Sequence, residues 1–99
     1  MIKRKQSVYI IADDVSKAFK IGRAWHPESR LRELQVGNPN QLRIVDVIKN
    51  GGKRLERAMH RTYHKDRLLG EWFRYHVPGE KLDVQCRDGV IRQWTIPSV

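Results

Sequence analysis

Two short apolar runs separated by a polar turn open the patterned part of the chain. The runs VYIIA and FKIG alternate in a way that predicts a β-hairpin. One face of that hairpin would be apolar and would carry Val8, Ile10, Phe19 and Ile21. A turn at Asp14-Val15 would place Tyr9 opposite Lys20 on the other face, where cross-strand Cβ atoms lie about 5 Å apart.

A helix is predicted in the following stretch, HPESRLRELQVG. Pro27 suits the first helical turn, and Gly37 suits the position just past the end. Leu31 and Leu34 mark the buried stripe, with Arg30 at its edge. The turn GNPNQ then leads into residues 42–49, which alternate as a strand. Because both faces of that strand carry apolar residues, it is predicted to be central in the sheet.

A second helix is predicted in GKRLERAMHRTYHKD, after the break at NGG. Its inner stripe would consist of Leu55, Ala58, Met59 and Thr62. At 100° per residue, Glu56 and His60 fall along one rim of this stripe, and Tyr63 falls between them and the core. Arg57 and Arg61 would point outward.

The last third of the chain predicts a short strand and a second hairpin. GEWFRY, residues 70–75, would be the strand, with Trp72 and Phe73 in the core. The hairpin, about residues 81–97, would turn near Asp88-Gly89 and either cover a sheet edge or extend the sheet. These short, closely spaced elements predict one α+β domain over residues 1–99, with its core at about 7–76.

The charge balance indicates a polyanionic partner. Twenty Lys and Arg residues face eleven Asp and Glu residues, a formal net charge of +9. Such an excess favours nucleic acid, although a basic protein can also use its charge for solubility alone. The single cysteine excludes an intrachain disulfide, and no apolar run approaches the roughly 20 residues that span a bilayer. An intracellular location is therefore expected.

Single residues admit ordinary explanations. Arg30 could pair with Glu28 or Glu33, a kind of surface pair that contributes about 0–1 kcal/mol. His60 and His64 lie four apart on one helix, as metal ligands can. The stretch HRTYH lacks the glutamate of the HExxH zinc motif, however, so zinc is not favoured. Glu71 could simply support the turn before the last core strand.

Taken in order, these stretches resemble the GIY-YIG nuclease superfamily. Val8-Tyr9 resembles the end of the first signature, and KIG at residues 20–22 resembles the second, with lysine in place of tyrosine. Arg30 resembles the family's catalytic arginine in its spacing from Gly22, and Glu56 resembles the metal-binding glutamate that the family places on the next long helix. KIG, RLRELQVGNP, LERAMH and GEWF are most similar to a branch found in phage proteins and in a fungal meiotic protein. The resemblance covers about three-quarters of the chain.

The resemblance implies a small antiparallel β-sheet with a three-stranded core, flanked by helices. It implies that Tyr9 orients or deprotonates the attacking water and that Arg30 contacts phosphate oxygens. Lys20 would lower the pKa of Tyr9 or contact the phosphate. Glu56 would bind one divalent metal ion, Mg²⁺ or alternatively Mn²⁺. His60 would act on the leaving group, hold Glu56 in place, or serve only as a buried structural histidine.

The function expected from these features is a metal-dependent endonuclease that cuts or nicks DNA. The alternative is a nucleic-acid-binding module that has the same fold and lacks catalysis. A protein-interaction domain would explain neither the charge nor the ordered residues. Symmetric double-strand cutting would require a homodimer, and sequence specificity would require a protein partner. The branch indicates the cytoplasm of a bacterium or of a phage-infected host.

Overall fold

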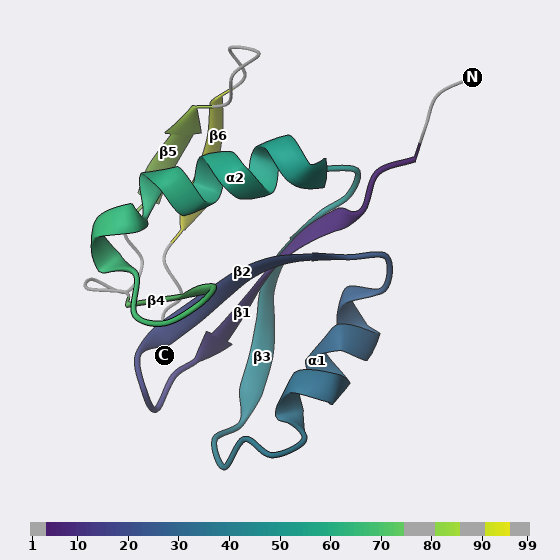
Figure 1. The fold of residues 1–99 in the computed structure, drawn as a ribbon, viewed down its shortest axis with the longest axis vertical. Coiled ribbons are helices and arrows are strands. Elements are labelled where there is room, and N and C mark those ends of the chain that lie inside the picture. Colours follow the sequence, from purple (N-terminus) through teal and green to yellow (C-terminus); the bar gives the residue numbers. More distant parts are fainter. Residues whose placement is uncertain (1–3, 75–80, 86–90, 96–99) are drawn as a thin grey trace.

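The fold is an antiparallel sheet with a helix on each face, as the computed structural model shows for residues 4–74, 81–85 and 91–95 (Figure 1). The strands of this sheet follow the order β3-β1-β2-β4, and β5 and β6 pair in a separate two-stranded sheet. The elements are β1 (Ser7–Asp13), β2 (Ala18–Ala24), α1 (Pro27–Gln35), β3 (Leu42–Ile48), α2 (Gly52–Thr62), the 3-10 helix η1 (His64–Asp66), β4 (Trp72–Arg74), β5 (Lys81–Gln85) and β6 (Ile91–Thr95). The predicted α+β class is confirmed.

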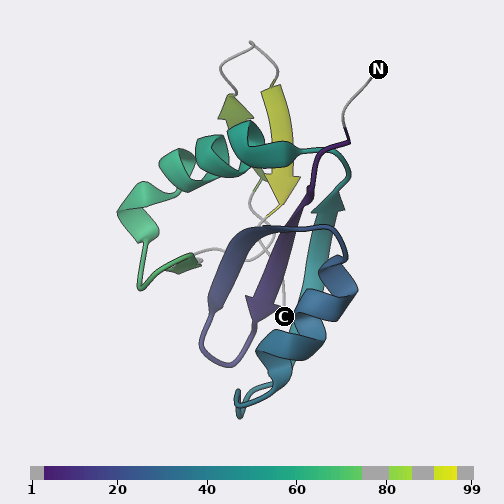
Figure 2. The ribbon, with the colours of Figure 1, turned by 45° about the vertical axis from the view of Figure 1, so that its right-hand side comes forward.

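Alternation along β1 and β2 divides the core into two layers. On one face, α2 covers a cluster of buried residues: Val8, Ile10, Phe19, Ile21, Ile48, Leu55, Ala58, Met59, Tyr63 and Phe73. On the other face, α1 lies over Tyr9, Ile11 and Leu42, with Leu31 and Leu34 half-buried against them. Figure 2 shows α1 on the side of the sheet away from α2. The predicted apolar face of the hairpin is therefore confirmed.

The hairpin register differs from the prediction by two residues. Tyr9 pairs with Gly22, and Lys20 pairs with Ile11, so Tyr9 and Lys20 share a face without being opposite each other. The cause is the turn, which has four residues, 14–17, instead of two. The Asp13 carboxylate accepts hydrogen bonds from the backbone amides of residues 15 and 16, both at 3.1 Å, and this stabilises the longer turn.

Two further predictions were wrong in detail. Among the described strands, β3 pairs only with β1, so it is an edge strand. Its apolar residues on both faces are explained by the two helices, since Val45 packs in the α2 layer and Ile44 in the α1 layer. In α2, Thr62 is exposed and its hydroxyl bonds back to the Ala58 carbonyl at 2.9 Å. Tyr63 takes the buried place, with its ring 5.1 Å from that of Phe19.

Other boundaries agree with the sequence. Pro27 begins α1, and Gly37 has a positive φ of 81° just past its end. The C-terminal hairpin forms, but it pairs only with itself among the described strands, and β5 lies beside α2 (Figure 1). The predicted turn at Asp88-Gly89 lies outside the described residues. No helix in the described ranges is long and apolar enough to cross a membrane.

Candidate active site at the open edge of β2

The second half of β2 forms an edge to which no described strand is paired. β4 pairs only with residues 18–20 of β2 and then ends. Beyond that point, the Ile21 amide donates to the Glu71 carbonyl at 3.2 Å, and the Ile21 carbonyl accepts from His60 Nε2 at 3.0 Å. The short β4 thus lets side chains from α2 and from the loop before β4 gather against β2.

Gly22 explains how Tyr9 fits into this region. A Cβ atom built on Gly22 would lie only 2.3 Å from the Tyr9 hydroxyl oxygen, so the phenol lies directly across this residue. The Tyr9 side chain is 1% exposed. Glycine at position 22 is therefore a packing requirement for the tyrosine above it, and any larger residue would displace the hydroxyl group.

The Tyr9 hydroxyl is held in its neutral form. Burial raises the pKa of Tyr9 above its ordinary value, and the negative charges of Glu71 and Glu56 act in the same direction. Hydrogen bonding and charge from Arg30 on α1 oppose that rise without cancelling it. Arg30 also donates to Glu33 at 2.9 Å. The charge that lowers the Tyr9 pKa comes from Arg30 and not, as expected, from Lys20, and the net shift of that pKa is upward.

Lys20 forms its ion pair with Glu71. Its Nζ lies 3.0 Å from Glu71 Oε2 and 5.9 Å from the centre of the Trp72 ring. The lysine side chain is buried, whereas Glu71 is half-exposed. A buried ammonium needs such a countercharge. Lys20 therefore positions Glu71 at the edge of β2, on the side of the sheet where Tyr9 lies.

Three groups of this region are placed like metal ligands. Donor atoms of Glu56, His60 and Glu71 all lie within 4.8 Å of one another. Because a carbonyl can only accept, His60 Nε2 carries the proton that it donates to Ile21, which leaves Nδ1 as the nitrogen that a metal ion would use. Ligating histidines commonly donate their other ring N–H to a backbone carbonyl in this way.

The carboxylate of Glu56 is incompletely compensated. Its side chain is 14% exposed, and Arg23 Nε lies 3.4 Å away, too far for a strong ionic hydrogen bond. Burial and the negative Glu71 raise the pKa of Glu56, while Arg23 and His60 oppose that rise. A carboxylate in this state gains from a bound cation. Two carboxylates and an imidazole are a donor set suited to a divalent ion.

The predicted site residues thus fall into two adjoining groups. Tyr9 and Arg30 adjoin on the α1 side, and Glu56 and His60 adjoin on α2, with Lys20 linked to them through Glu71. His64 lies on η1 and is outside the metal-binding group found in the described residues.

The sequence pattern assigned no role to Arg23, and it indicated Glu71 as a turn residue and as the carboxylate to test next if Glu56 is not the metal ligand. Arg23 directly follows Gly22 on the open edge, and Glu71 directly precedes Trp72 on β4. Only the register of β2 against β4 shows that the two residues are near the site.

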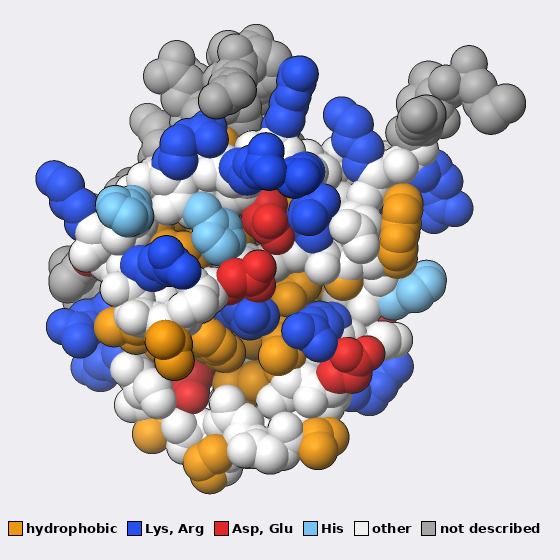
Figure 3. Space-filling model, in the orientation of Figure 1, with side chains coloured by type: hydrophobic (Ala, Val, Ile, Leu, Met, Phe, Trp, Pro, Cys, Tyr) orange, Lys and Arg blue, Asp and Glu red, His pale blue; other side chains and the backbone are white. Residues whose placement is uncertain are grey.

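Basic side chains surround this region. Figure 3 shows acidic side chains and a histidine near the middle of one face, with lysine and arginine side chains around them. Such a surface attracts a polyanion to the carboxylates that would otherwise repel it. The geometry combines a neutral phenol, a guanidinium, a cation-binding donor set and a positive surround, the components that phosphodiester hydrolysis needs.

Comparison with known proteins identifies the class to which this α+β domain belongs. The chain belongs to the T5orf172 domain family, whose model matches residues 6–95. This domain is found in phage proteins and is associated with nuclease-type modules that act on DNA. No curated protein and no solved structure matches the chain. The family match spans the four-stranded sheet and both strands of the C-terminal hairpin.

Proposed function

We propose that the protein is a metal-dependent endonuclease of the GIY-YIG type that hydrolyses phosphodiester bonds in DNA. The observation that carries the proposal is that Arg30, Glu71 and Glu56 all act on the pKa of Tyr9, while Glu56 and Glu71 also form a group with His60 in which the donor atoms lie within 4.8 Å of one another. These residues come from β1, α1, α2 and the loop before β4. Glu56 supports the proposal further, because this mostly buried carboxylate has only a 3.4 Å contact with Arg23 and a raised pKa, and perturbed groups of this kind concentrate at functional sites.

The divalent ion would be held by Glu56, with Glu71 and His60 Nδ1 beside it. Mg²⁺ suits the carboxylates, and Mn²⁺ also accepts an imidazole. When bound, such an ion neutralises charge on the phosphate and increases the acidity of a coordinated water. Glu71 is shared with Lys20, so the lysine would keep this carboxylate near the site.

The protein's own groups would then divide the remaining work. The neutral Tyr9 hydroxyl would orient the attacking water by hydrogen bonding, since its raised pKa leaves almost no phenolate at neutral pH. Arg30 would stabilise negative charge on the phosphate oxygens. His60 donates to the Ile21 carbonyl, which favours a positioning role for this histidine over action on the leaving group.

Supercoiled plasmid provides the test. Wild-type protein with Mg²⁺ or Mn²⁺ should convert it to the nicked form, and EDTA should stop the reaction. Because the described residues hold one cluster of this kind, a single chain should nick one strand; a linear product in one step would require a dimer. If the protein binds plasmid but cuts it with neither metal, the alternative of a catalytically inactive binding module replaces this proposal.

A further inference from the structure

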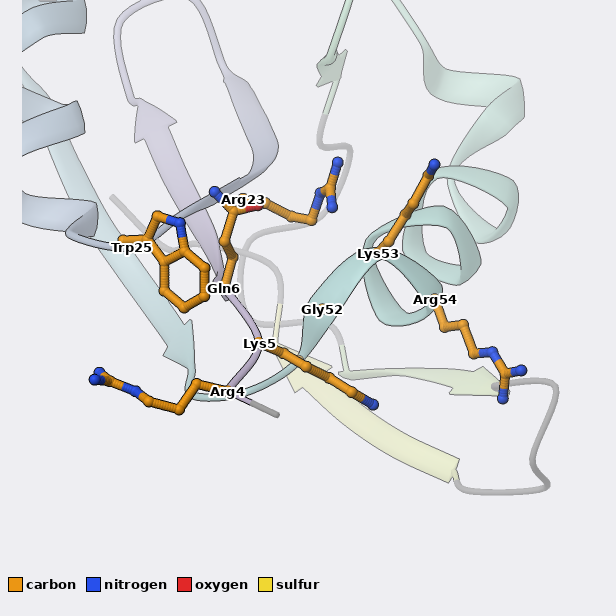
Figure 4. Close-up of a pocket in the computed structure, with 9 residues that line it drawn as sticks. Arg4, Lys5, Gln6, Arg23, Trp25, Gly52, Lys53 and Arg54 are labelled. Atoms are coloured by element: carbon orange, nitrogen blue, oxygen red, sulfur yellow. The ribbon is translucent and has the colours of Figure 1, made fainter. Parts of the chain in front are cut away.

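A strongly basic pocket adjoins the Glu56 region and includes an exposed tryptophan. Its charged lining consists entirely of cations in the described residues: Arg4, Lys5, Arg23, Lys53 and Arg54. Figure 4 shows that they come from the N-terminal segment, from β2 and from the start of α2, with Trp25 at one side. The Trp25 side chain is 53% exposed.

Trp25 contributes to neither layer of the core. It follows the end of β2. It also lines the neighbouring pocket, together with Arg4, Lys5 and Lys49. The indole therefore lines two neighbouring pockets that share Arg4 and Lys5. This alternation of an aromatic surface with cations is how proteins hold unpaired bases and the phosphates on either side of them.

The pocket is built on a fixed backbone. The Gly52 amide donates to the Gln6 carbonyl at 3.0 Å, and the Lys5 amide donates to Asn50 Oδ1 at 3.2 Å. Gly52 has a φ of 70°, and a Cβ there would come within 3.0 Å of the Lys5 side chain. The glycine thus lets the N-terminal segment pass close to the first turn of α2. The cations on both segments are therefore presented together.

Arg23 connects this pocket to the candidate active site. It lines the pocket, and its Nε lies 3.4 Å from Glu56 Oε1. A strand whose phosphates contact the pocket is thereby directed toward the carboxylates. A base can stack on Trp25 only when it is free of its neighbours, because bases inside a duplex are already stacked on one another.

We propose that the Trp25 pocket binds a single-stranded stretch of polynucleotide, with one base stacked on the indole and the adjoining phosphates on the surrounding cations. The substrate class of the proposed nuclease is then nucleic acid with an unpaired segment next to the bond that is cut. This inference rests on the proposed function for its biological meaning. The binding that it describes can nevertheless be measured without cleavage.

The test is fluorescence anisotropy in EDTA with labelled dT12, U12 and a 12-base-pair duplex at one salt concentration. Trp25→Ala should weaken dT12 binding about tenfold and duplex binding less than twofold, since stacking acts only on the unpaired base. Trp25→Phe should restore most of the affinity. Val36→Ala, which also removes an exposed apolar side chain, should have no effect. Arg54→Ala should weaken the binding of all three ligands, because all of them contain phosphates.

Comparison of dT12 with U12 shows whether the site prefers DNA or RNA, and Trp25-dependent binding of either strand supports a single-strand site. The proposal is overturned if Trp25→Ala leaves both single strands unaffected, or weakens the duplex as much as the single strands. Because EDTA removes the metal, loss of plasmid cutting would not alter these results. Conversely, an active nuclease with Trp25-independent binding would refute this inference alone.

Discussion

Asp13 lies at the turn of the β1–β2 hairpin, and Glu56 of α2 lies against Arg23 near the other end of β2. Both carboxylates are largely removed from water, but their pKa values shift in opposite directions. Asp13, at the turn, is 5% exposed, and burial alone would raise its pKa. Hydrogen bonds from Asn40, Ser16 and Val15 outweigh burial and lower that pKa below its ordinary value. Glu56, at the open edge, has a raised pKa because Arg23 and His60 compensate too little for burial and for Glu71.

The difference separates a structural carboxylate from one that is available for chemistry. The acceptor capacity of Asp13 is used by its own turn and by Asn40, so it has little left for a ligand. Glu56 has an unfavourable charge in a region that also contains a second carboxylate and the His60 imidazole. Perturbed groups of the second kind concentrate at functional sites.

The largest expected effect concerns the open edge. Glu56→Gln keeps the side-chain shape and removes the charge that would hold a divalent ion. Metal assistance contributes several kcal/mol, so plasmid cleavage should fall by roughly a thousandfold. Binding of DNA in EDTA should persist or tighten slightly, because a negative charge next to the phosphates is removed. Glu28→Gln, an exposed glutamate on α1, should retain the wild-type rate.

Stability should respond to Glu56→Gln in the opposite sense to activity. A carboxyl whose pKa is raised on folding contributes stability that is present at low pH and lost as pH rises through the folded pKa. The unfolding temperature in EDTA at pH 7 should therefore stay the same or rise. A cleavage rate close to that of wild type, with normal folding, would remove Glu56 from the mechanism and leave Glu71 as the carboxylate to test.

A smaller effect is expected at the phenol. Tyr9→Phe should lower cleavage by at least about tenfold with little change in DNA affinity, since an orienting or proton-transfer group contributes about 10²–10⁴-fold. Tyr63→Phe is the matched control, because Tyr63 is also buried and lies in the α2 layer away from Arg30. Equal rates for the two variants would show that the Tyr9 hydroxyl has no part in the reaction.

Substitution of Asp13 at the hairpin turn should change the stability of the protein and leave its cleavage rate unchanged. Asp13→Ala removes the acceptor of several partly buried donors, so the free energy of unfolding should fall by about 1–3 kcal/mol. Because the Asp13 pKa is lowered on folding, its contribution is present above the ordinary aspartate pKa and lost as pH falls through the folded value. Denaturant titrations at pH 7 and at pH 3 should therefore show a smaller difference between variant and wild type in acid. The folded fraction should cleave DNA at the wild-type rate.

The sequence predicted the faces of the hairpin but not its register. Alternation assigns Tyr9 and Lys20 to one face for a two-residue or a four-residue turn alike, because a register shift of two residues keeps every side chain on its face. The pairing of Tyr9 with Gly22 depends on a four-residue turn that the Asp13 side chain stabilises, and no periodicity contains that information. The positions of Arg30 and Glu56 could be predicted because the helical period puts each residue at the edge of the buried stripe of its helix.

Other features depend on contacts between distant segments. Glu71 joins the candidate site only because β4 stops at residue 20 of β2. The Trp25 pocket requires Lys5 to lie against Gly52, 47 residues further along the chain, and the absence of a Cβ atom at Gly52 is what permits that approach. Helical and strand periods describe which residues are neighbours within one element, so they cannot predict contacts between segments that are distant in the sequence.

The most direct test of the contrast between the two acids is Mn²⁺ binding measured by electron paramagnetic resonance. Wild-type protein should bind one ion per chain, and its affinity should fall as pH drops through the raised Glu56 pKa, because protonation competes with the metal. Glu56→Gln should weaken binding by at least about tenfold, since even outer-shell partners of a metal account for 10–100-fold. Asp13→Asn should bind Mn²⁺ as wild type does. Unchanged binding in Glu56→Gln, or an equal loss in Asp13→Asn, would contradict the assignment of the metal site to the open edge of β2.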